Sequence, residues 1–127
     1  MEEQAGDGCP AVDEAVALMG NRWTVLVLGV LSKQKTLRYN ELQRAVEGIS
    51  QRMLTLTLKK LEENGFVKRT IFPVVPPRVD YELTPLGRTL VEPLKALLDW
   101  TRENRAAMAE ARRAYARALN KARLSST

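Results

Sequence analysis

Apolar residues along this chain recur mainly at helical spacing, and the clearest example lies near its middle. Ser50 can cap the start of a helix there, because its hydroxyl can accept a hydrogen bond from the first turn. Asn64-Gly65 can end that helix, since glycine adopts a left-handed backbone without strain. Between these limits, three leucines follow one another at the i, i+4 and i+7 intervals of one buried helical stripe: Leu54, Leu58 and Leu61.

Two further helices are predicted before this one. The first runs from Asp7 to Gly20. The second runs from Arg22 to about Leu31 after a possible Asn21 cap, and it looks buried nearly all round, as the central helix of a small bundle is. The apolar side of the first helix is formed by Val12, Val16 and Met19. The apolar residues of the second include Trp23, Leu26, Val27, Val30 and Leu31.

A third helix is predicted over residues 39–46, directly before the leucine helix. A polar loop over residues 32–35 precedes it, and residues 36–38 are short enough to form an edge strand. Only a few residues separate the third helix from the leucine helix, which is typical of a helix-turn-helix. Ile49 in the turn is expected to fill the core between the two. The buried positions of the third helix are Leu42 and Val46, and Gly48 ends it.

Strand-like composition follows the leucine helix. Two runs, Val67 to Phe72 and Arg78 to Leu83, are joined by the proline-rich residues 73–77. Proline cannot donate a hydrogen bond to a sheet and restricts the backbone, so this hairpin should end in a stiff projecting loop. A helix-turn-helix followed by such a hairpin is a winged helix.

The last helix is expected to begin at Thr84-Pro85, an N-cap followed by proline at the first helical position. Pro93 lies inside this helix and is expected to bend or restart it, because proline removes one backbone hydrogen bond. Residues 105–124 are rich in alanine and arginine, which predicts a helix that is either exposed or packed on a partner. The large apolar residues of the first part are Leu86, Leu90, Leu94, Leu97, Leu98 and Trp100.

These elements together predict a mainly α fold with a small β-hairpin wing. The fold class is a winged helix-turn-helix with additional N- and C-terminal helices for dimerisation. A chain of 127 residues fits a single domain. Within that domain we expect a core from about residue 9 to residue 103 and a basic helical extension over residues 104–127.

Composition excludes several functions. The chain has one cysteine and no histidine, so an internal disulfide is excluded and neither a metal site nor a cofactor is expected. Without a histidine base or a glycine-rich phosphate loop, the chain is not expected to be an enzyme. The longest apolar run, Val25 to Leu31, is too short to cross a bilayer. The polar N-terminus shows no signal peptide, which predicts a cytoplasmic protein without membrane contact.

The net charge of +5 and the pI near 9.7 are compatible with a polyanionic partner. The charge is uneven, since the start of the chain is acidic and its end is basic. Part of the positive excess therefore lies outside the winged helix, in residues that are expected to be solvated rather than to follow DNA. These are Arg102, Arg105, Arg112, Arg113, Arg117, Lys121 and Arg123.

Ordered motifs carry a family resemblance from about Cys9 to Trp100. They are Cys9-Pro10, Gly20 to Thr24, Leu37 to Leu42, Gly48 to Ser50 with Leu54, Leu61 to Val67, and Pro76 to Gly87. In sequence and spacing they resemble the HxlR-type transcriptional regulators, relatives of the MarR winged helices. The resemblance implies a homodimer, joined through its first and last helices, that binds a palindromic operator in double-stranded DNA. The interface residues in the last helix would be Leu90, Leu94, Leu97, Leu98 and Trp100.

The polar side of the leucine helix is the expected reading surface. Arginine and glutamine can contact guanine and adenine edges, and threonine can meet a thymine methyl or a phosphate. Ser50 and the backbone N–H groups beside it can hold a phosphate at the helix N-terminus. The alternative is an ordinary solvated helix face, which the turn and the hairpin make the weaker interpretation. The reading residues would be Gln51, Arg52, Thr55 and Lys59.

Other basic residues extend the predicted contacts. Arg78 at the base of the wing can enter the minor groove or form a salt bridge with Asp80, and the sequence favours neither. Lys68 and Arg69 share the base of the wing. Phosphate contacts are expected from Arg22, Lys35 and Arg38.

Leu56 and Cys9 are the two positions with open roles. Leu56 stands where the family pattern usually has a polar residue, and packing against the wing is expected rather than a contact with a thymine methyl. Cys9 is the one candidate sensor of electrophiles or oxidants, because it lies close to a helix N-terminus that would lower a thiol pKa. It would react by forming a disulfide to the other subunit or an adduct. The alternative, slightly favoured, is a small buried side chain at the dimer interface.

The predicted function is a homodimeric, sequence-specific regulator of transcription, with repression expected rather than activation. A small-molecule or redox effector is compatible with this function. One alternative is a winged-helix protein-interaction module, in which alanine at the reading residues would leave operator binding unchanged. Another is a non-specific nucleic-acid-binding protein, which would bind every duplex with similar affinity.

Overall fold

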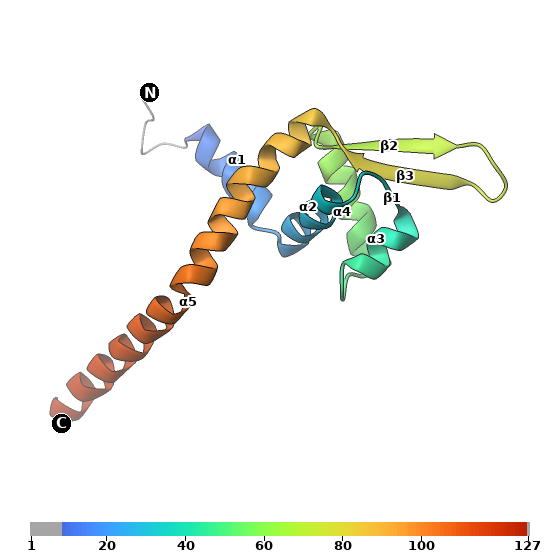
Figure 1. Cartoon of the computed structure of the whole chain (residues 1–127). Coiled ribbons are helices and arrows are strands. Elements are labelled where there is room, and N and C mark those ends of the chain that lie inside the picture. The colour runs from blue at the N-terminus through green and yellow to red at the C-terminus, as the bar shows by residue number, and fades with distance from the viewer. Residues whose placement is uncertain (1–8, 127) are drawn as a thin grey trace. The chain divides into compact units, whose positions relative to one another are not determined.

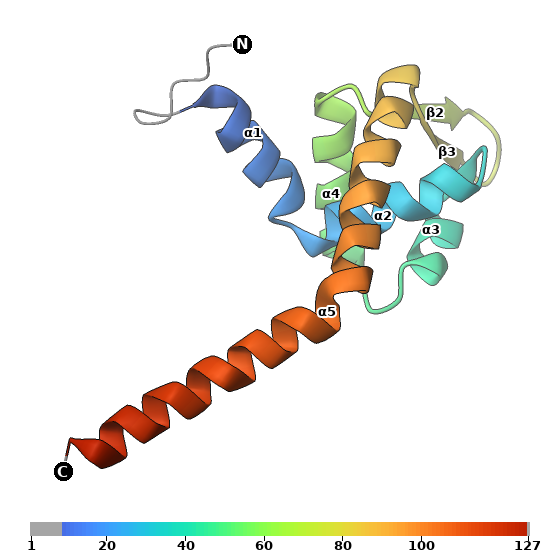
Figure 2. The same ribbon diagram turned by 60° about the vertical axis from the view of Figure 1, so that its left-hand side comes forward.

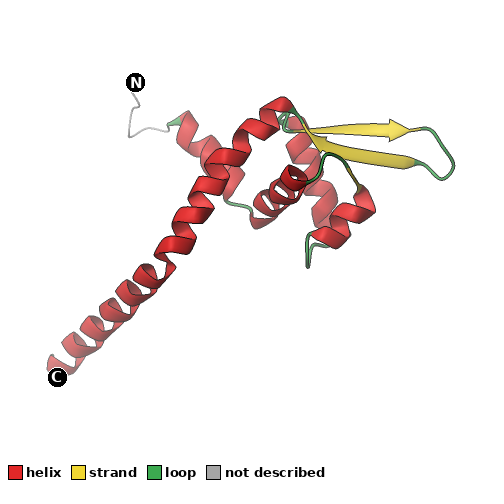
Figure 3. Cartoon of the chain, in the orientation of Figure 1, coloured by secondary structure: helices red, strands yellow, loops and turns green. Residues whose placement is uncertain are grey.

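The computed structural model describes residues 9–126 and divides at Pro93 into two compact units (Figure 1). The first unit, residues 9–92, holds the helix-turn-helix and the sheet. Helices and strands are distinguished by colour in Figure 3. In chain order, the elements are α1 (Pro10–Met19), α2 (Arg22–Lys33), β1 (Leu37–Arg38), α3 (Tyr39–Ala45), α4 (Gln51–Glu63), β2 (Val67–Phe72), β3 (Arg78–Leu83) and α5 (Pro85–Ser125).

The core of the first unit lies among α2, α3, α4 and the sheet, and α2 packs against each of them (Figure 2). The leucine stripe expected in α4 is buried against this core. Ile49 in the turn between α3 and α4 is buried as expected. The buried apolar residues are Val27, Leu28, Leu31, Leu42, Val46, Ile49, Leu54, Leu58, Leu61, Val67, Tyr81 and Leu83.

The sheet confirms the predicted wing. Its three antiparallel strands lie in the order β1-β3-β2. β2 and β3 form a hairpin in which Val67 pairs with Leu83 and Phe72 pairs with Arg78. Its far end, with the proline-rich loop, extends beyond helices α2, α3 and α4 (Figure 1). The short edge strand is confirmed as β1, with Leu37 opposite Tyr81. The winged helix-turn-helix fold class is therefore confirmed.

Local capping explains why α4 begins and ends where the sequence predicts. The Ser50 hydroxyl accepts a hydrogen bond from the Met53 N–H at 3.1 Å. At the other end, the Phe66 N–H donates to the Leu61 carbonyl at 2.9 Å, and the Gly65 N–H donates to the Glu62 carbonyl at 3.0 Å. These two bonds form a Schellman motif, which Gly65 permits with a φ of 80°. Both ends of the helix are thus set by residues of the same stretch.

The second helix differs from its prediction in two ways. It extends to Lys33, so Ser32 and Lys33 belong to α2 rather than to the polar loop. The Ser32 hydroxyl donates to the Gly29 carbonyl at 2.6 Å, a local bond within the last turns of the helix. The helix is also not buried all round, because Leu26 is 37% exposed and Gly29 is exposed. A single covered face is enough to anchor α2 in this small core.

The first and last helices also differ from expectation at one point each. The described part of α1 begins at Pro10, with Cys9 as its N-cap, and Asp7 lies outside the described residues. α5 begins as predicted, since the Thr84 hydroxyl accepts from the Gly87 N–H at 3.0 Å. It then continues through Pro93 as one helix, so of the two expected outcomes, a bend or a restart, the restart does not occur.

The second unit, residues 93–126, consists of the remainder of α5. Its charged residues form local pairs along the helix, such as Arg113 and Arg117 with Glu110, each at 3.0 Å. Among residues 9–126, no single helix is long and apolar enough to cross a membrane. By length and composition the bent pair Pro10–Leu18 and Arg22–Lys33 passes such a test, as core helices of soluble proteins also do.

Candidate nucleic-acid interface

Helix α4 presents the expected reading residues on one exposed face. Its buried residues fix the rotation of the helix about its axis, so the polar positions between them point away from the core. Within residues 9–126, no ion pair engages Arg52 or Lys59, although both are exposed. All five residues predicted for this surface are exposed: Ser50, Gln51, Arg52, Thr55 and Lys59. The structure thus brings them together on a surface with unused hydrogen-bonding capacity.

Tyr39 ties the start of this face to α3, a contact that the sequence pattern did not reveal. Its hydroxyl donates to the Gln51 carbonyl at 2.8 Å and lies 2.8 Å from the Thr55 hydroxyl. The Tyr39 ring packs at a tilt against Tyr81 of β3, with 6.5 Å between ring centroids. A polar aromatic residue at the first position of α3 was the available signal. Its partners lie 12 and 16 residues away in α4, beyond any local pattern.

Arg78 lies next to the loop of the hairpin, where it pairs with Phe72, so the expectation that it shares the base of the wing with Lys68 and Arg69 is wrong. It forms the salt bridge that was one of its two predicted roles. Its Nε and Nη2 donate to the two carboxylate oxygens of Asp80, each at 3.0 Å. The guanidinium also lies over the Phe72 ring, 5.0 Å from the ring centroid. These hydrogen bonds raise the pKa of Arg78 and lower the pKa of the Asp80 carboxyl, which the positive charge of Arg38 lowers further. Arg78 therefore stabilises the wing.

The other basic residues are distributed over several elements. Lys68 and Arg69 are exposed on β2, and Arg69 lies 3.5 Å from Glu62 of α4. Arg38 is exposed on β1 opposite Asp80, the residue that pairs with Arg78. Arg22 lies apart from these, at the start of α2, with its guanidinium 5.0 Å from the centroid of a Trp23 ring. Lys35 is exposed in the loop before β1.

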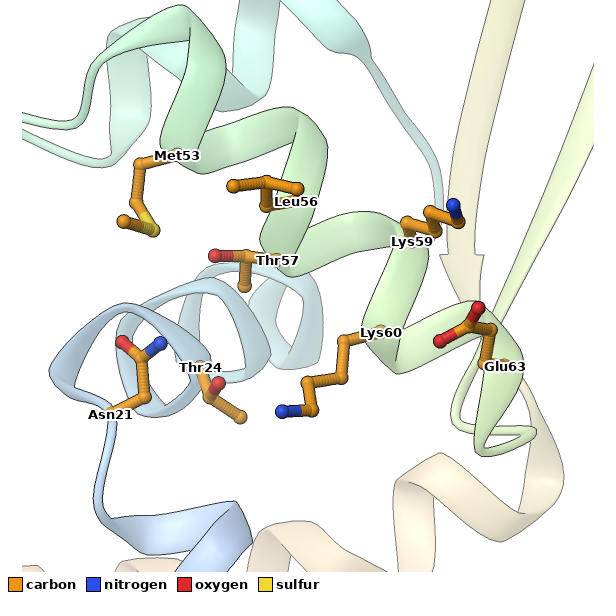
Figure 4. Close-up of a pocket in the computed structure, with 8 residues that line it drawn as sticks. All are labelled: Asn21, Thr24, Met53, Leu56, Thr57, Lys59, Lys60 and Glu63. Atoms are coloured by element: carbon orange, nitrogen blue, oxygen red, sulfur yellow. The ribbon is translucent and has the colours of Figure 1, made fainter.

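A shallow pocket of about 430 Å³ lies between α4 and the start of α2 (Figure 4). Lys60 extends its ammonium group toward Thr24 of α2, whereas Lys59 extends away from α2. Leu56 lines this pocket and is 49% exposed, so the expectation that it packs against the wing is wrong. The rotation of α4 directs this position toward α2. The lining residues are Asn21, Thr24, Met53, Leu56, Thr57, Lys59, Lys60 and Glu63.

The predicted dimer and sensor residues lie on the first and last helices. Cys9, the N-cap of α1, is partly exposed. On α5, Leu90 and Leu94 are partly buried, while Leu97, Leu98 and Trp100 are 46, 41 and 53% exposed. Val12 and Val16 of α1 are more than half exposed as well. Both helices thus present apolar side chains at their surfaces.

The geometry defines a helix-turn-helix with a wing, and comparison with known proteins identifies the family. Residues 18–109 match the family model of the HxlR-like helix-turn-helix. The uncharacterised HTH-type transcriptional regulator YtfH of Escherichia coli K12 is 43% identical over 96 residues, which cover 76% of this chain and 75% of that protein. The chain belongs to the HxlR family and is a helix-turn-helix transcriptional regulator.

Solved structures support the same assignment. The putative transcriptional regulator ytfH of Salmonella typhimurium is 38% identical, with a TM-score of 0.72 over 87% of this chain and 98% of that one. The redox regulator HypR in its reduced form is 34% identical, with a TM-score of 0.71 over 79% of this chain and 98% of that one. These similar proteins are named as regulators rather than as enzymes.

Proposed function

We propose that this protein binds a specific double-stranded DNA sequence through α4 and represses transcription as a homodimer in the cytoplasm. The observation that carries the proposal is the exposed polar face of α4, rigidly held by three buried leucines and capped at both ends. Gln51 and Arg52 lie in its first turn, where side chains of a recognition helix reach base edges in the major groove. Ser50 and Lys68 supply groups for phosphate contacts, together with Arg22, Lys35 and Arg38. Lys59 was expected from the sequence among the reading residues, but it lies two turns further along α4 than Gln51, and the N-terminal residues of a recognition helix contact the base edges. We therefore assign Lys59 to the phosphate contacts.

A second copy of the chain explains the apolar surface of the first and last helices. Val12 and Val16 of α1, with Leu97, Leu98 and Trp100 of α5, leave apolar side chains exposed to water in the single chain. A symmetric partner would cover such surfaces on both subunits with one type of contact. Two α4 helices related by a twofold axis would then enter successive major grooves, roughly 34 Å apart. The matching operator is a palindrome.

Footprinting tests this proposal directly. The probe is the DNA upstream of the protein's own gene and of the neighbouring genes. We expect protection of two half-sites whose centres lie about 10 base pairs apart, as one helical turn requires. A protected site that overlaps a promoter supports repression, and transcription from that promoter should fall when the protein is added. Uniform protection of every fragment would instead indicate non-specific binding and would contradict the proposal.

Regulation by a thiol-reactive signal is the second part of the proposal. Cys9 is partly exposed at the start of α1, and one structurally similar protein is named as a redox regulator. An oxidant could remove two electrons and two protons from the Cys9 thiols of two subunits to form a disulfide, whereas an electrophile would form an adduct with each thiol. Footprinting with and without diamide tests this step. Wild-type binding should change and Cys9→Ser binding should not; equal responses of both proteins would exclude Cys9 as the sensor.

A further inference from the structure

The Tyr39 hydroxyl joins two groups of α4 that have different hydrogen-bonding capacities. The Gln51 carbonyl oxygen, 2.8 Å away, can only accept a hydrogen bond. The Thr55 hydroxyl, also 2.8 Å away, can either donate or accept. The Tyr39 hydroxyl carries a single hydrogen. If that hydrogen pointed at Thr55, two acceptor oxygens would face each other at the Gln51 carbonyl without a proton between them.

The hydrogens of this cluster therefore have one consistent arrangement. Tyr39 donates its hydrogen to the Gln51 carbonyl, and Thr55 donates its own hydrogen to the Tyr39 oxygen. Both contacts then become normal hydrogen bonds of 2.8 Å. The Thr55 hydroxyl thus donates its only hydrogen within the protein. Its remaining lone pairs can only accept a hydrogen bond, so Thr55 acts as an acceptor toward a ligand.

We infer that Tyr39 sets the base preference of Thr55, restricting its hydroxyl to the amino groups of adenine or cytosine. This inference rests on the proposed function, in which α4 enters the major groove. There, adenine N6 and cytosine N4 present donors, whereas guanine O6 and N7 and thymine O4 present acceptors. An acceptor-only hydroxyl attracts the former and repels the latter. It also repels phosphate oxygens, which removes the phosphate contact considered for Thr55 from sequence. Tyr39 is thus a positioning residue, since it acts through Thr55.

Selection of full-length protein on a library of randomised duplexes tests the inference. The wild-type chain should enrich adenine or cytosine over guanine or thymine at one position of each half-site, by roughly fivefold, as one hydrogen bond allows. Thr55→Val removes the hydroxyl at nearly constant shape, and it should abolish this preference while leaving the other positions unchanged. Tyr39→Phe frees the hydroxyl hydrogen of Thr55, so guanine and thymine should be accepted at the same position.

Controls separate this effect from folding and from the proposed function. Tyr115→Phe makes the same chemical change at an exposed site of the second unit and should leave the selected sequence unchanged. If Tyr39 had only a structural role, Tyr39→Phe would weaken binding to all duplexes alike and keep the base preference, and this result would overturn the inference. A wild-type preference for guanine or thymine at the position that Thr55→Val alters would overturn it as well. If the wild-type chain enriches no sequence, the proposed function itself fails.

Discussion

Helix α4 and the wing both carry cationic side chains, but the two regions use them differently. On α4, Arg52 and Lys59 are exposed and take part in none of the ion pairs found within residues 9–126. On the wing, Arg78 is held by Asp80 at 3.0 Å, and Arg69 lies 3.5 Å from Glu62. The cations of α4 are therefore available for a ligand, whereas Arg69 and Arg78 of the wing are engaged within the fold.

The difference follows from the geometry of the two elements. Residues 78 and 80 of a strand point to the same face, so an arginine and an aspartate at this spacing meet. In α4, the residues next to one another on the exposed face are three or four positions apart, and Arg52 has no acid at either spacing. Lys59 has Glu62 and Glu63 at these spacings, but within residues 9–126 Glu62 pairs with Arg69 of β2 and neither acid pairs with Lys59. A basic residue is thus informative about binding only when the secondary structure around it is known.

The largest expected effect is that of Arg52→Ala on DNA binding. If Arg52 contacts a base edge, its loss should weaken binding to the selected duplex by about 1–3 kcal/mol and should relax the preference at one base pair. Fluorescence anisotropy with the selected and singly substituted duplexes measures both quantities. The matched control is Arg113→Ala, which removes an arginine paired with Glu110 in the second unit. Equal losses of affinity for the two variants would show that Arg52 of α4 has no specific role in DNA binding.

Lys59→Ala should have a smaller effect that does not depend on sequence. A phosphate contact contributes to all duplexes alike, so affinity should fall about equally for selected and scrambled sites. The slope of log affinity against log salt concentration should decrease by about 1, because one fewer counterion is released. Titrations at several salt concentrations provide this slope. A change of base preference without a change of slope would place Lys59 on the base edges instead.

Arg78→Ala should affect stability more than binding. It removes the partner of Asp80, which is only 7% exposed, and leaves a carboxylate with little water around it. Thermal unfolding should occur at a lower temperature, while affinity for the selected duplex should change far less than for Arg52→Ala. Lys68→Ala on β2 is the comparison for stability, because it removes an exposed cation that forms no ion pair within residues 9–126, and its thermal unfolding temperature should stay close to that of the wild type. If Arg78→Ala weakened DNA binding as strongly as Arg52→Ala, Arg78 would contact the DNA, which was the other role predicted for it.

The smallest expected effect is on the stability of the fold at acidic pH. The pKa of Asp80 is lowered in the folded protein from an ordinary value of 3.8, so its charged form stabilises the fold above that value. This contribution is lost as the pH falls through the lowered pKa, because the carboxylate then takes up a proton and releases Arg78. The free energy of unfolding, measured by urea titration across this range, should decrease more steeply for the wild type than for Asp80→Asn. Parallel curves would show that the pair does not stabilise the wing.

Local sequence predicted the limits of α4 because its caps and its stripe lie within one short stretch. Ser50, Asn64-Gly65 and the three leucines act on neighbours only a few residues away, and the structure places each as expected. The same holds for Thr84 at the start of α5. Elements of this kind need no knowledge of the tertiary fold.

Properties that depend on distant partners were not predictable in the same way. Leu56 faces α2 rather than the wing, because the rotation of α4 in the core decides which neighbour it meets. The contact of Tyr39 with Thr55 joins residues of α3 and α4 that no periodicity connects. For Arg78, the sequence allowed two roles, and only its two hydrogen bonds with Asp80 in the folded structure favour the salt bridge.

The central claim is that the exposed face of α4 distinguishes one DNA sequence from others. The most direct test is the ratio of affinities for the selected duplex and for a scrambled duplex of the same composition, at physiological salt. For the wild-type chain we expect a ratio of roughly 10³ or more. In the double variant Gln51→Ala and Arg52→Ala, the ratio should fall toward one while the thermal unfolding temperature remains unchanged. A ratio near one for the wild type, or an undiminished ratio for the variant, would contradict the claim.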